Sequence, residues 1–141
     1  MKSLQILLVE DNEGDIILTQ EAFEECNFLT NIHVARNGKE AITYLFENCT
    51  NSHLPDLILL DINLPLLNGH EVLKKIKEND KTKHIPVVIL TTSSASTDVN
   101  LTYANHANSF ISKPSEVDDF FETISTVGKF WFDTCKLPEA K

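Results

Sequence analysis

The chain has 141 residues, of which 42% are hydrophobic and 23% are charged, and its formal net charge is -9 at pH 7. This length suits one hydrophobic core, and we expect a single domain over residues 1–141. The acidic balance argues against nucleic acid and against an anionic membrane surface as partners, because both require a basic face.

The sequence also favours a location in the cytoplasm. The strongly apolar runs are strand-sized and too short to span a membrane, and the first residues lead straight into a strand instead of a signal-peptide core. Cys26, Cys49 and Cys135 are odd in number and far apart. This spacing favours free thiols in a reducing compartment over a zinc site.

Apolar runs of strand length alternate with segments of helical spacing along the chain. In chain order, the predicted elements are a strand at 4–9, a helix at 14–26, a strand at 32–35, a helix after Asn37-Gly38, a strand at 56–60, a helix at 69–77, a strand at 87–90, a helix at 94–105, a strand at 109–112 and a helix at about 115–135. This alternation predicts an α/β fold whose parallel sheet is covered by helices on both faces.

Polar side chains stand where four of these five strands end. Glu10 and Asp11 follow the first strand, Asp61 the third, Thr91 the fourth and Lys113 the fifth. Parallel sheets of this kind bind ligands outside the carboxyl ends of their strands. We therefore expect these residues to form one polar site.

Three carboxylates brought together repel one another unless a cation joins them. Oxygen ligands without histidine or cysteine suit Mg²⁺, with Mn²⁺ as a second possibility. Lys113 would supply a compact positive charge for a phosphoryl oxygen, and Thr91 a hydroxyl donor. A carboxylate in such surroundings can act as a nucleophile toward phosphorus and form an aspartyl phosphate.

Four sequence blocks carry a resemblance to a known family. They are Val9-Glu10-Asp11-Asn12, Leu60-Asp61-Ile62-Asn63-Leu64-Pro65 with Gly69, Leu90-Thr91-Thr92-Ser93 and Phe110-Ile111-Ser112-Lys113-Pro114. In this order and spacing they resemble the receiver domain of two-component response regulators, over nearly the whole chain. The resemblance implies a flavodoxin-like (βα)5 three-layer sandwich with strand order 2-1-3-4-5. It also implies a single-domain response regulator in a phosphorelay, a signalling protein whose own catalysis is limited to phosphotransfer and autodephosphorylation.

The resemblance assigns roles to the acids. Asp61 is the implied phosphoacceptor, charged by a phosphohistidine on a sensor histidine kinase or a phosphotransfer protein. Glu10, Asp11 and Asp61 would hold Mg²⁺, with the backbone carbonyl of Asn63 as a further ligand. Asn63 also occupies one of the positions that tune the lifetime of the phosphoryl group in this family.

The same resemblance assigns a switch. Thr91 would turn its hydroxyl toward the phosphoryl group, Phe110 would turn inward after it, and Lys113 would bind the phosphoryl group. Together they would change the surface around the fourth helix and the fifth strand. The bond from Lys113 to Pro114 is expected to be cis, and Ser93 is the second lifetime-tuning position.

A narrower resemblance points to a class of partner. Residues 91–94, 107–110, 128–132 and 136–138 look like those of small single-domain regulators paired with bacterial phytochrome kinases. The resemblance implies a phytochrome among the possible kinase partners.

The last predicted helix carries more aromatic residues than one core-facing stripe needs. The stripe expected to cover the sheet consists of Val117, Phe121, Ile124, Gly128, Trp131 and Cys135. Exposed apolar patches often mark interfaces, so we predict a homodimer through the fourth helix, the fifth strand and the last helix. The predicted interface residues are Phe120, Phe130, Trp131 and Phe132. The alternative is that these rings fold back on their own chain.

Three other functions remain to be weighed. A flavin-binding electron carrier of the same fold would need a phosphate loop after the first strand, where Glu10 and Asp11 would repel the phosphate. A phosphatase with an aspartyl nucleophile typically has a second acid where this chain has Asn63. A binding module that works unphosphorylated would not need the complete acidic set and lysine. The five histidines show no metal-ligand spacing, and we expect them to be scattered on the surface.

Overall fold

The computed structural model describes residues 3–26, 28–49 and 53–138. Its five parallel strands form one sheet in the order β2-β1-β3-β4-β5, which confirms the predicted fold class and strand order. The strands are β1 (Leu4–Val9), β2 (Thr30–Ala35), β3 (Leu57–Leu60), β4 (Val87–Thr91) and β5 (Ser109–Ser112).

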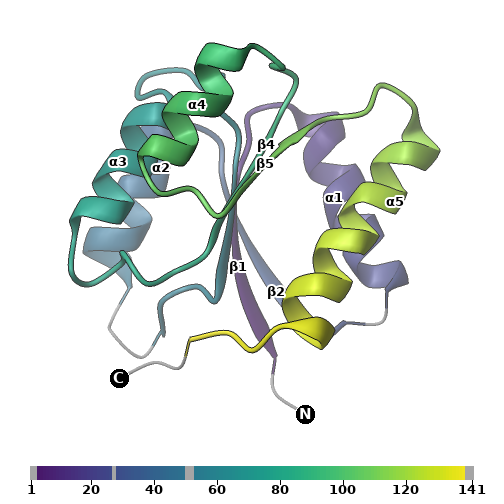
Figure 1. The fold of residues 1–141 in the computed structure, drawn as a ribbon. Helices are drawn as coiled ribbons and strands as arrows, with labels where there is room; N and C mark the ends of the chain where they lie inside the picture. Colours follow the sequence, from purple (N-terminus) through teal and green to yellow (C-terminus); the bar gives the residue numbers. More distant parts are fainter. Residues whose placement is uncertain (1–2, 27, 50–52, 139–141) are drawn as a thin grey trace.

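Helices cover both faces of the sheet (Figure 1), with α1 and α5 on one side and α2, α3 and α4 on the other. The helices are α1 (Glu13–Glu25), α2 (Gly38–Thr43), α3 (Gly69–Glu78), α4 (Ser96–Ala104) and α5 (Val117–Gly128). Two of them continue as π-helical turns, α2 into η1 (Tyr44–Asn48) and α5 into η3 (Lys129–Thr134). None of the described helices has the length and apolar character needed to cross a membrane.

The sheet separates two hydrophobic cores. Leu7 and Val9 of β1 pack in the core that includes α2 and α3, whereas Ile6 and Leu8 pack in the core of α1 and α5. This division follows from the strand itself, because successive side chains point to opposite faces. Every residue of β3 and β4 is buried, as expected for strands covered on both sides.

Asparagine side chains start three of the helices. Asn12 Oδ1 accepts a hydrogen bond from the Asp15 N–H at 2.9 Å, Asn37 Oδ1 from the Glu40 N–H at 2.8 Å, and Asn68 Oδ1 from the Glu71 N–H at 3.1 Å. Such caps satisfy N–H groups that the helix leaves free. The first of these caps also places Asp15 at the polar edge of the sheet.

The structure corrects the placement of Phe120. We expected this ring at a dimer interface, but it is 3% exposed and packs in the core with Ile124 and Val127, while Val117 of the predicted stripe is 55% exposed. Both helical phases contain Ile124, so the spacing alone did not choose between them. The observed phase removes the larger apolar area from water.

The other aromatic residues of this region have divided roles. Phe132 folds back on its own chain, with its ring centroid 6.0 Å from that of Phe23 and 5.3 Å from that of Phe28. Trp131 is half-buried against the same core. Phe130 remains 49% exposed and meets Trp131 edge to face at 5.2 Å. Among the predicted interface rings, Phe130 is therefore the one that faces outward.

Candidate functional site

A buried lysine gathers three carboxylates at the carboxyl edge of the sheet. Lys113 Nζ donates to Glu10 Oε1 at 2.5 Å, to Asp15 Oδ2 at 2.9 Å and to Asp61 Oδ2 at 3.1 Å. The side chains of Lys113, Glu10 and Asp61 are 4%, 3% and 7% exposed. Residues that follow β1, β3 and β5 thus meet in one place, as the sequence pattern predicted.

The acids also have the spacing of a cation site. Glu10, Asp11 and Asp61 each offer a carboxylate oxygen, and these oxygens lie within 4.8 Å of one another. Glu10 and Asp61 are buried whereas Asp11 is exposed, so the cluster opens toward solvent on one side. An all-oxygen set with three negative charges fits a hard divalent cation.

Burial and neighbouring charges have opposite effects on the pKa values of Glu10 and Lys113. Burial raises the pKa of Glu10 from 4.5 to about 7, against the hydrogen bond and positive charge of Lys113, which lower it. Burial alone would lower the pKa of Lys113, but the hydrogen bond and charge of Glu10, supported by Asp15 and Asp61, raise it above the usual lysine value. Lys113 is therefore firmly cationic, and Glu10 exchanges its proton near neutral pH.

The backbone around Asp61 is held by close contacts. The Asn63 N–H donates to Asp61 Oδ1 at 3.2 Å, and the Gly69 N–H donates to the Ile62 carbonyl at 2.8 Å. A Cβ atom on Gly69 would lie 2.3 Å from the Asp61 carbonyl oxygen. A side chain at this position would collide with the backbone of Asp61 and Ile62, so only glycine lets α3 start this close to Asp61.

Comparison with known families agrees with this geometry. The family of the response regulator receiver domain matches residues 6–125. The chain belongs to this family. Receiver domains are signalling modules, and phosphorylation of an aspartate is their general mechanism.

Several receiver proteins resemble this one over most of their length. Response regulator Rcp1 of Synechocystis sp. is 40% identical over 137 residues, which are 96% of this chain and 93% of Rcp1. The probable methanogenesis regulatory protein FilR2 of Methanothrix harundinacea is 40% identical over 134 residues, which are 94% of this chain and 86% of FilR2.

Solved structures give the same picture. The crystal structure of the phosphorylated cyanobacterial phytochrome response regulator RcpA matches with 39% identity and a TM-score of 0.93, covering 98% of this chain and 100% of RcpA. The Mn²⁺-bound form of Rcp1 matches with 38% identity and a TM-score of 0.89, covering 96% of this chain and 99% of that one.

Of the predicted switch residues, Lys113 belongs to the receiver site, which consists of Lys113 with Glu10, Asp11, Asp15 and Asp61. Thr91 is joined to Lys113 through the backbone, because the Lys113 N–H donates to the Thr91 carbonyl at 2.6 Å. Thr91 is fully buried, and its Oγ1 accepts a hydrogen bond from the Ser93 N–H at 3.4 Å. The Phe110 ring is half-buried against the core of α2 and α3, and its N–H donates to the Tyr103 hydroxyl at 3.1 Å. Tyr103 is therefore a link between α4 and β5 that the sequence did not suggest.

Asp15 is the member of the receiver site that sequence reasoning missed. It sits in the first turn of α1, its side chain is 25% exposed, and it contacts the same ammonium as Glu10 and Asp61. The usable signal was its place three residues after the helix-capping Asn12, close behind the acidic pair. Position in a helix does not by itself give the direction of a side chain, so an acid in the first turn of a helix is not distinguished by its sequence from one that only faces solvent.

The structure does not bear out the expected cis bond between Lys113 and Pro114. Every peptide bond in the described ranges is trans. The trans form of an X–Pro bond is favoured by about 0.5–1 kcal/mol. With this bond trans, the Lys113 side chain still reaches all three carboxylates, so the site geometry does not require the rarer isomer.

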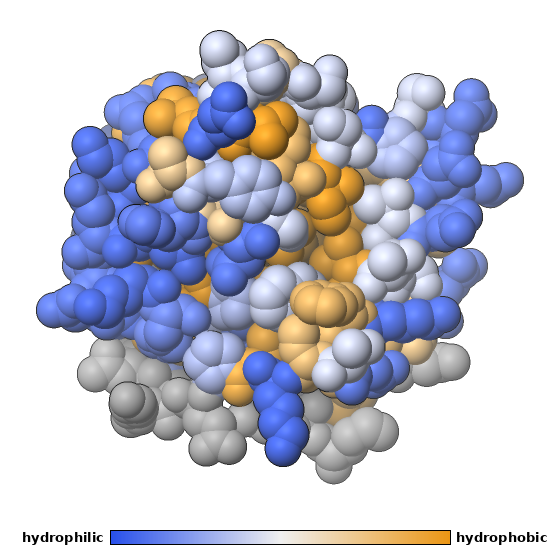
Figure 2. Space-filling view, viewed as in Figure 1, coloured by the Kyte–Doolittle hydropathy of each residue, from blue (hydrophilic) through white to orange (hydrophobic). Residues whose placement is uncertain are grey.

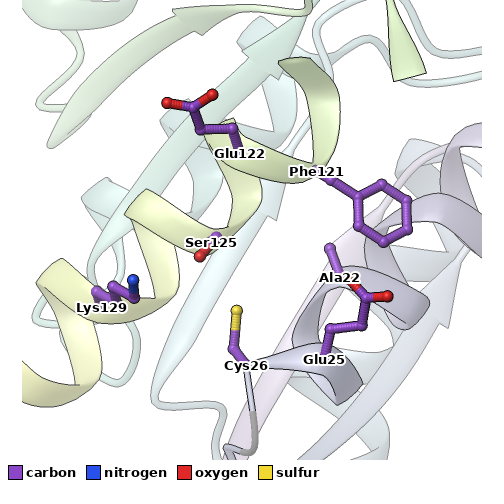
Figure 3. A pocket seen from close by; sticks show the side chains of 7 residues that line it. All are labelled: Ala22, Glu25, Cys26, Phe121, Glu122, Ser125 and Lys129. Carbon is purple, nitrogen blue, oxygen red and sulfur yellow. The ribbon is translucent and has the colours of Figure 1, made fainter. Parts of the chain in front are cut away.

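A groove of about 420 Å³ lies between α1 and α5 (Figure 3), and Glu10, Asp11 and Asp61 are not among its lining residues. Ala22, Cys26, Phe121, Ser125 and Lys129 are among its lining residues, and the Cys26 side chain points into it. Cys26 directly follows α1, Lys129 begins η3, and the other three lie beyond the first turns of α1 and α5, whereas Asp15 lies in the first turn of α1 and Lys113 precedes α5. The groove is thus separate from the receiver site.

The raised pKa of Glu10 predicts that cation binding depends on pH. A proton competes with the cation for the Glu10 carboxylate, so affinity should rise as pH increases through about 7. With that pKa, Mg²⁺ should bind about tenfold more weakly at pH 6 than at pH 8. Isothermal titration at the two pH values measures this ratio. In Glu10→Gln the affinity should be lower and the ratio close to one; an unchanged ratio in that variant would assign the proton elsewhere.

Proposed function

We propose that Asp61 accepts a phosphoryl group from a phosphohistidine on a sensor histidine kinase or a phosphotransfer protein. The observation that carries the proposal is the place of the Asp61 carboxylate. It accepts a hydrogen bond from the buried ammonium of Lys113, and it belongs to the group of three carboxylates that has the spacing of a divalent cation site. The positive charge of Lys113, together with that of a cation at this site, would offset the repulsion between the acceptor carboxylate and the negatively charged phosphoryl group.

The phosphoryl group passes directly from the donor histidine to Asp61. An Asp61 carboxylate oxygen attacks phosphorus, the P–N bond to the donor histidine breaks, and its electron pair returns to the imidazole nitrogen. The product is an acyl phosphate on Asp61. To bind a phosphoryl oxygen, Lys113 exchanges at least one carboxylate partner, while Asp15 continues to hold its ammonium. Attack by water later releases phosphate and restores the carboxylate.

The proposed cation is Mg²⁺, with Mn²⁺ as a substitute. Glu10, Asp11 and Asp61 would hold it, joined by the backbone carbonyl of Asn63, and it would neutralise charge on the phosphoryl oxygens. The oxygen-only donor set supports this assignment. The Mn²⁺-bound form of the similar Rcp1 supports it as well.

We further propose that the protein is a stoichiometric acceptor whose own catalysis is limited to taking up and losing one phosphoryl group. Its output would be a changed protein-binding surface around α4, β5 and α5, reached through Thr91 and Phe110. The similarity to RcpA, a phytochrome response regulator, favours a phytochrome as the source of the phosphoryl group. FilR2 has nearly the same sequence identity to this chain and is a probable methanogenesis regulatory protein. A phytochrome donor is therefore a narrower proposal than a sensor histidine kinase of any kind.

A small phosphoryl donor tests the proposal directly. Incubation with Mg²⁺ and acetyl phosphate should add one phosphoryl group to the intact mass, in a bond that is stable to acid and labile to base. Chelation of the cation with EDTA should prevent the addition. A protein that stays unmodified under both conditions would contradict the proposal, and steady release of phosphate from small phosphomonoesters would indicate a phosphatase instead.

We also propose that the protein forms a homodimer through the face of α4, β5 and α5. Figure 2 shows apolar side chains over α4 and along the strip between α4 and α5. Leu101, Tyr103, Val117 and Phe130 are 47%, 49%, 55% and 49% exposed. Such a patch supports an interface, and a two-fold pair is the usual arrangement of identical chains.

The Phe130 ring gives the sharpest test of this dimer, because its truncation spares the core. Multi-angle light scattering should find twice the mass of one chain for the wild type and a shift toward one chain for Phe130→Ala. Leu66→Ala is the matched control, since Leu66 is 78% exposed on the loop after β3. A wild type that is monomeric with and without acetyl phosphate would remove the dimer from the proposal.

A further inference from the structure

A second polar network joins α3, α4 and the loop between β4 and α4. Ser93 Oγ donates to Asp98 Oδ2 at 2.6 Å, and Asp98 Oδ1 lies 2.9 Å from His70 Nε2. His70 belongs to the first turn of α3, Asp98 to the first turn of α4, and Ser93 to the loop. One carboxylate thus connects α3 with the start of α4 and the loop before it, 28 residues further along the chain.

The side chains of this network are partly buried, and their hydrogen bonds define their orientations. The side chains of His70 and Asp98 are 18% and 30% exposed. His70 is thus the exception among the five histidines, because the other four are exposed as expected. His70 Nδ1 is buried and has no hydrogen-bond partner among the described residues, whereas Nε2 faces an acceptor oxygen of Asp98, so the geometry places a hydrogen on Nε2. The hydrogen bonds from Ser93 and His70 lower the pKa of Asp98, and its carboxylate is charged at neutral pH.

The order of the three groups separates this network from a hydrolytic triad. In a Ser-His-Asp triad the imidazole stands between the hydroxyl and the carboxylate and takes the hydroxyl proton. Here the carboxylate stands in the middle and accepts from both neighbours. The network can hold Ser93 in place, but it does not pass a proton from Ser93 to a histidine base.

Ser93 also contacts the surroundings of the acidic site through its backbone. Its N–H donates to Thr91 Oγ1 at 3.4 Å, and its carbonyl accepts from Ser112 Oγ at 3.2 Å. Thr91 is the proposed switch residue, and Ser112 directly precedes Lys113. Whatever holds Ser93 therefore also holds the loop that borders the site.

We propose that Asp98 is a positioning residue for the phosphoryl chemistry at Asp61 and acts through Ser93, while His70 orients Asp98. This inference rests on the proposed function. Asp98 accepts the hydrogen bond of the Ser93 hydroxyl. The hydroxyl is therefore not available to donate to a water molecule that could attack the phosphoryl group on Asp61. Without Asp98 the hydroxyl is free to orient such a water, and hydrolysis of the acyl phosphate becomes faster.

A double-mutant cycle tests the proposal on the full chain, phosphorylated with acetyl phosphate and Mg²⁺ and then freed of donor. Loss of the phosphoryl group is followed by intact mass. Asp98→Ala should shorten its lifetime about fivefold, the worth of one ordinary hydrogen bond. In a Ser93→Ala background the same substitution should have almost no effect, because the hydroxyl through which Asp98 acts is gone. Thr97→Ala, an exposed neighbour on α4, should keep the wild-type lifetime.

A spectroscopic measurement separates positioning from general damage to the fold. Imidazole ¹⁵N spectra should show His70 with its hydrogen on Nε2 in the wild type and in Ser93→Ala, and should lose this fixed tautomer in Asp98→Ala. An unchanged lifetime in Asp98→Ala, or equal shortening with and without Ser93, would overturn the inference while leaving the proposed function intact. If the wild type takes up no phosphoryl group, both fail together.

Discussion

Asp61→Asn should abolish phosphoryl incorporation from acetyl phosphate while leaving the protein folded. The amide keeps the size of the side chain, but it lacks the nucleophilic carboxylate that the reaction consumes. The substitution also removes a negative charge that raises the pKa of Glu10, so that pKa should fall below about 7. Intact-mass spectrometry measures the loss of the adduct, and circular dichroism confirms the fold.

Asp15→Asn is the matched control for this experiment. It removes a carboxylate from the same lysine but leaves Glu10, Asp11 and Asp61, the three acids of the cation cluster, in place. The control should still form the base-labile adduct, at a reduced rate. An adduct that survives Asp61→Asn would put the acceptor on another residue, and binding to a kinase that is indifferent to Asp61 would favour a module that works without phosphorylation.

Lys113→Met should have the largest effect on stability. It replaces the ammonium with an uncharged side chain of similar length and leaves Glu10 and Asp61 buried without their cation. Breaking a buried ion pair in this way costs about 3–5 kcal/mol. Urea unfolding at pH 8 without divalent cation measures the change in free energy, and incorporation from acetyl phosphate should also be strongly slowed.

The loss should depend on pH in a defined direction. Without Lys113, two causes that lower the pKa of Glu10 disappear, so its folded pKa rises above about 7. In the wild type the folded pKa of Glu10 is already about 7, so both proteins lose the same stability from this group between pH 4.5 and 7 and differ only at higher pH. The difference between variant and wild type should therefore be small near pH 5 and largest at pH 8, and Mg²⁺ should restore part of it.

Lys83→Met is the control for a lost lysine charge. Lys83 pairs with Asp80 at 2.9 Å, but the two side chains are 59% and 94% exposed. Its replacement should change the free energy of unfolding by less than about 0.5 kcal/mol. Equal losses for the two lysine variants would show that the Lys113 ion pairs do not carry the stability assigned to them.

The sequence predicted most of this fold because its signals were local. Buried runs such as Leu57–Leu60 and Val87–Thr91 have no polar alternation, and asparagine caps mark the starts of α1, α2 and α3. The meeting of Glu10, Asp11, Asp61 and Lys113 followed from one topological rule about the carboxyl ends of parallel strands.

The missed features depend on directions that sequence spacing does not specify. Phe120 and Val117 are three residues apart on one helix, and only packing against the sheet decided which is buried. Asp15 turned out to contact Lys113, and His70 to contact Asp98, because two helices start beside the site. Such contacts join residues 28 or more positions apart, and no local pattern encodes them.

The helices α3 and α4 are held to the rest of the protein to different degrees. The start of α3 rests on the Asp61 backbone with no room for even one more carbon atom, and α3 is anchored by Val72, Leu73 and Ile76. In α4 the one buried residue is Thr102. A change at Asp61 would therefore displace α4 more readily than α3, because fewer buried side chains hold α4. A partner that binds α4 would then bind differently to the two chemical states of the aspartate.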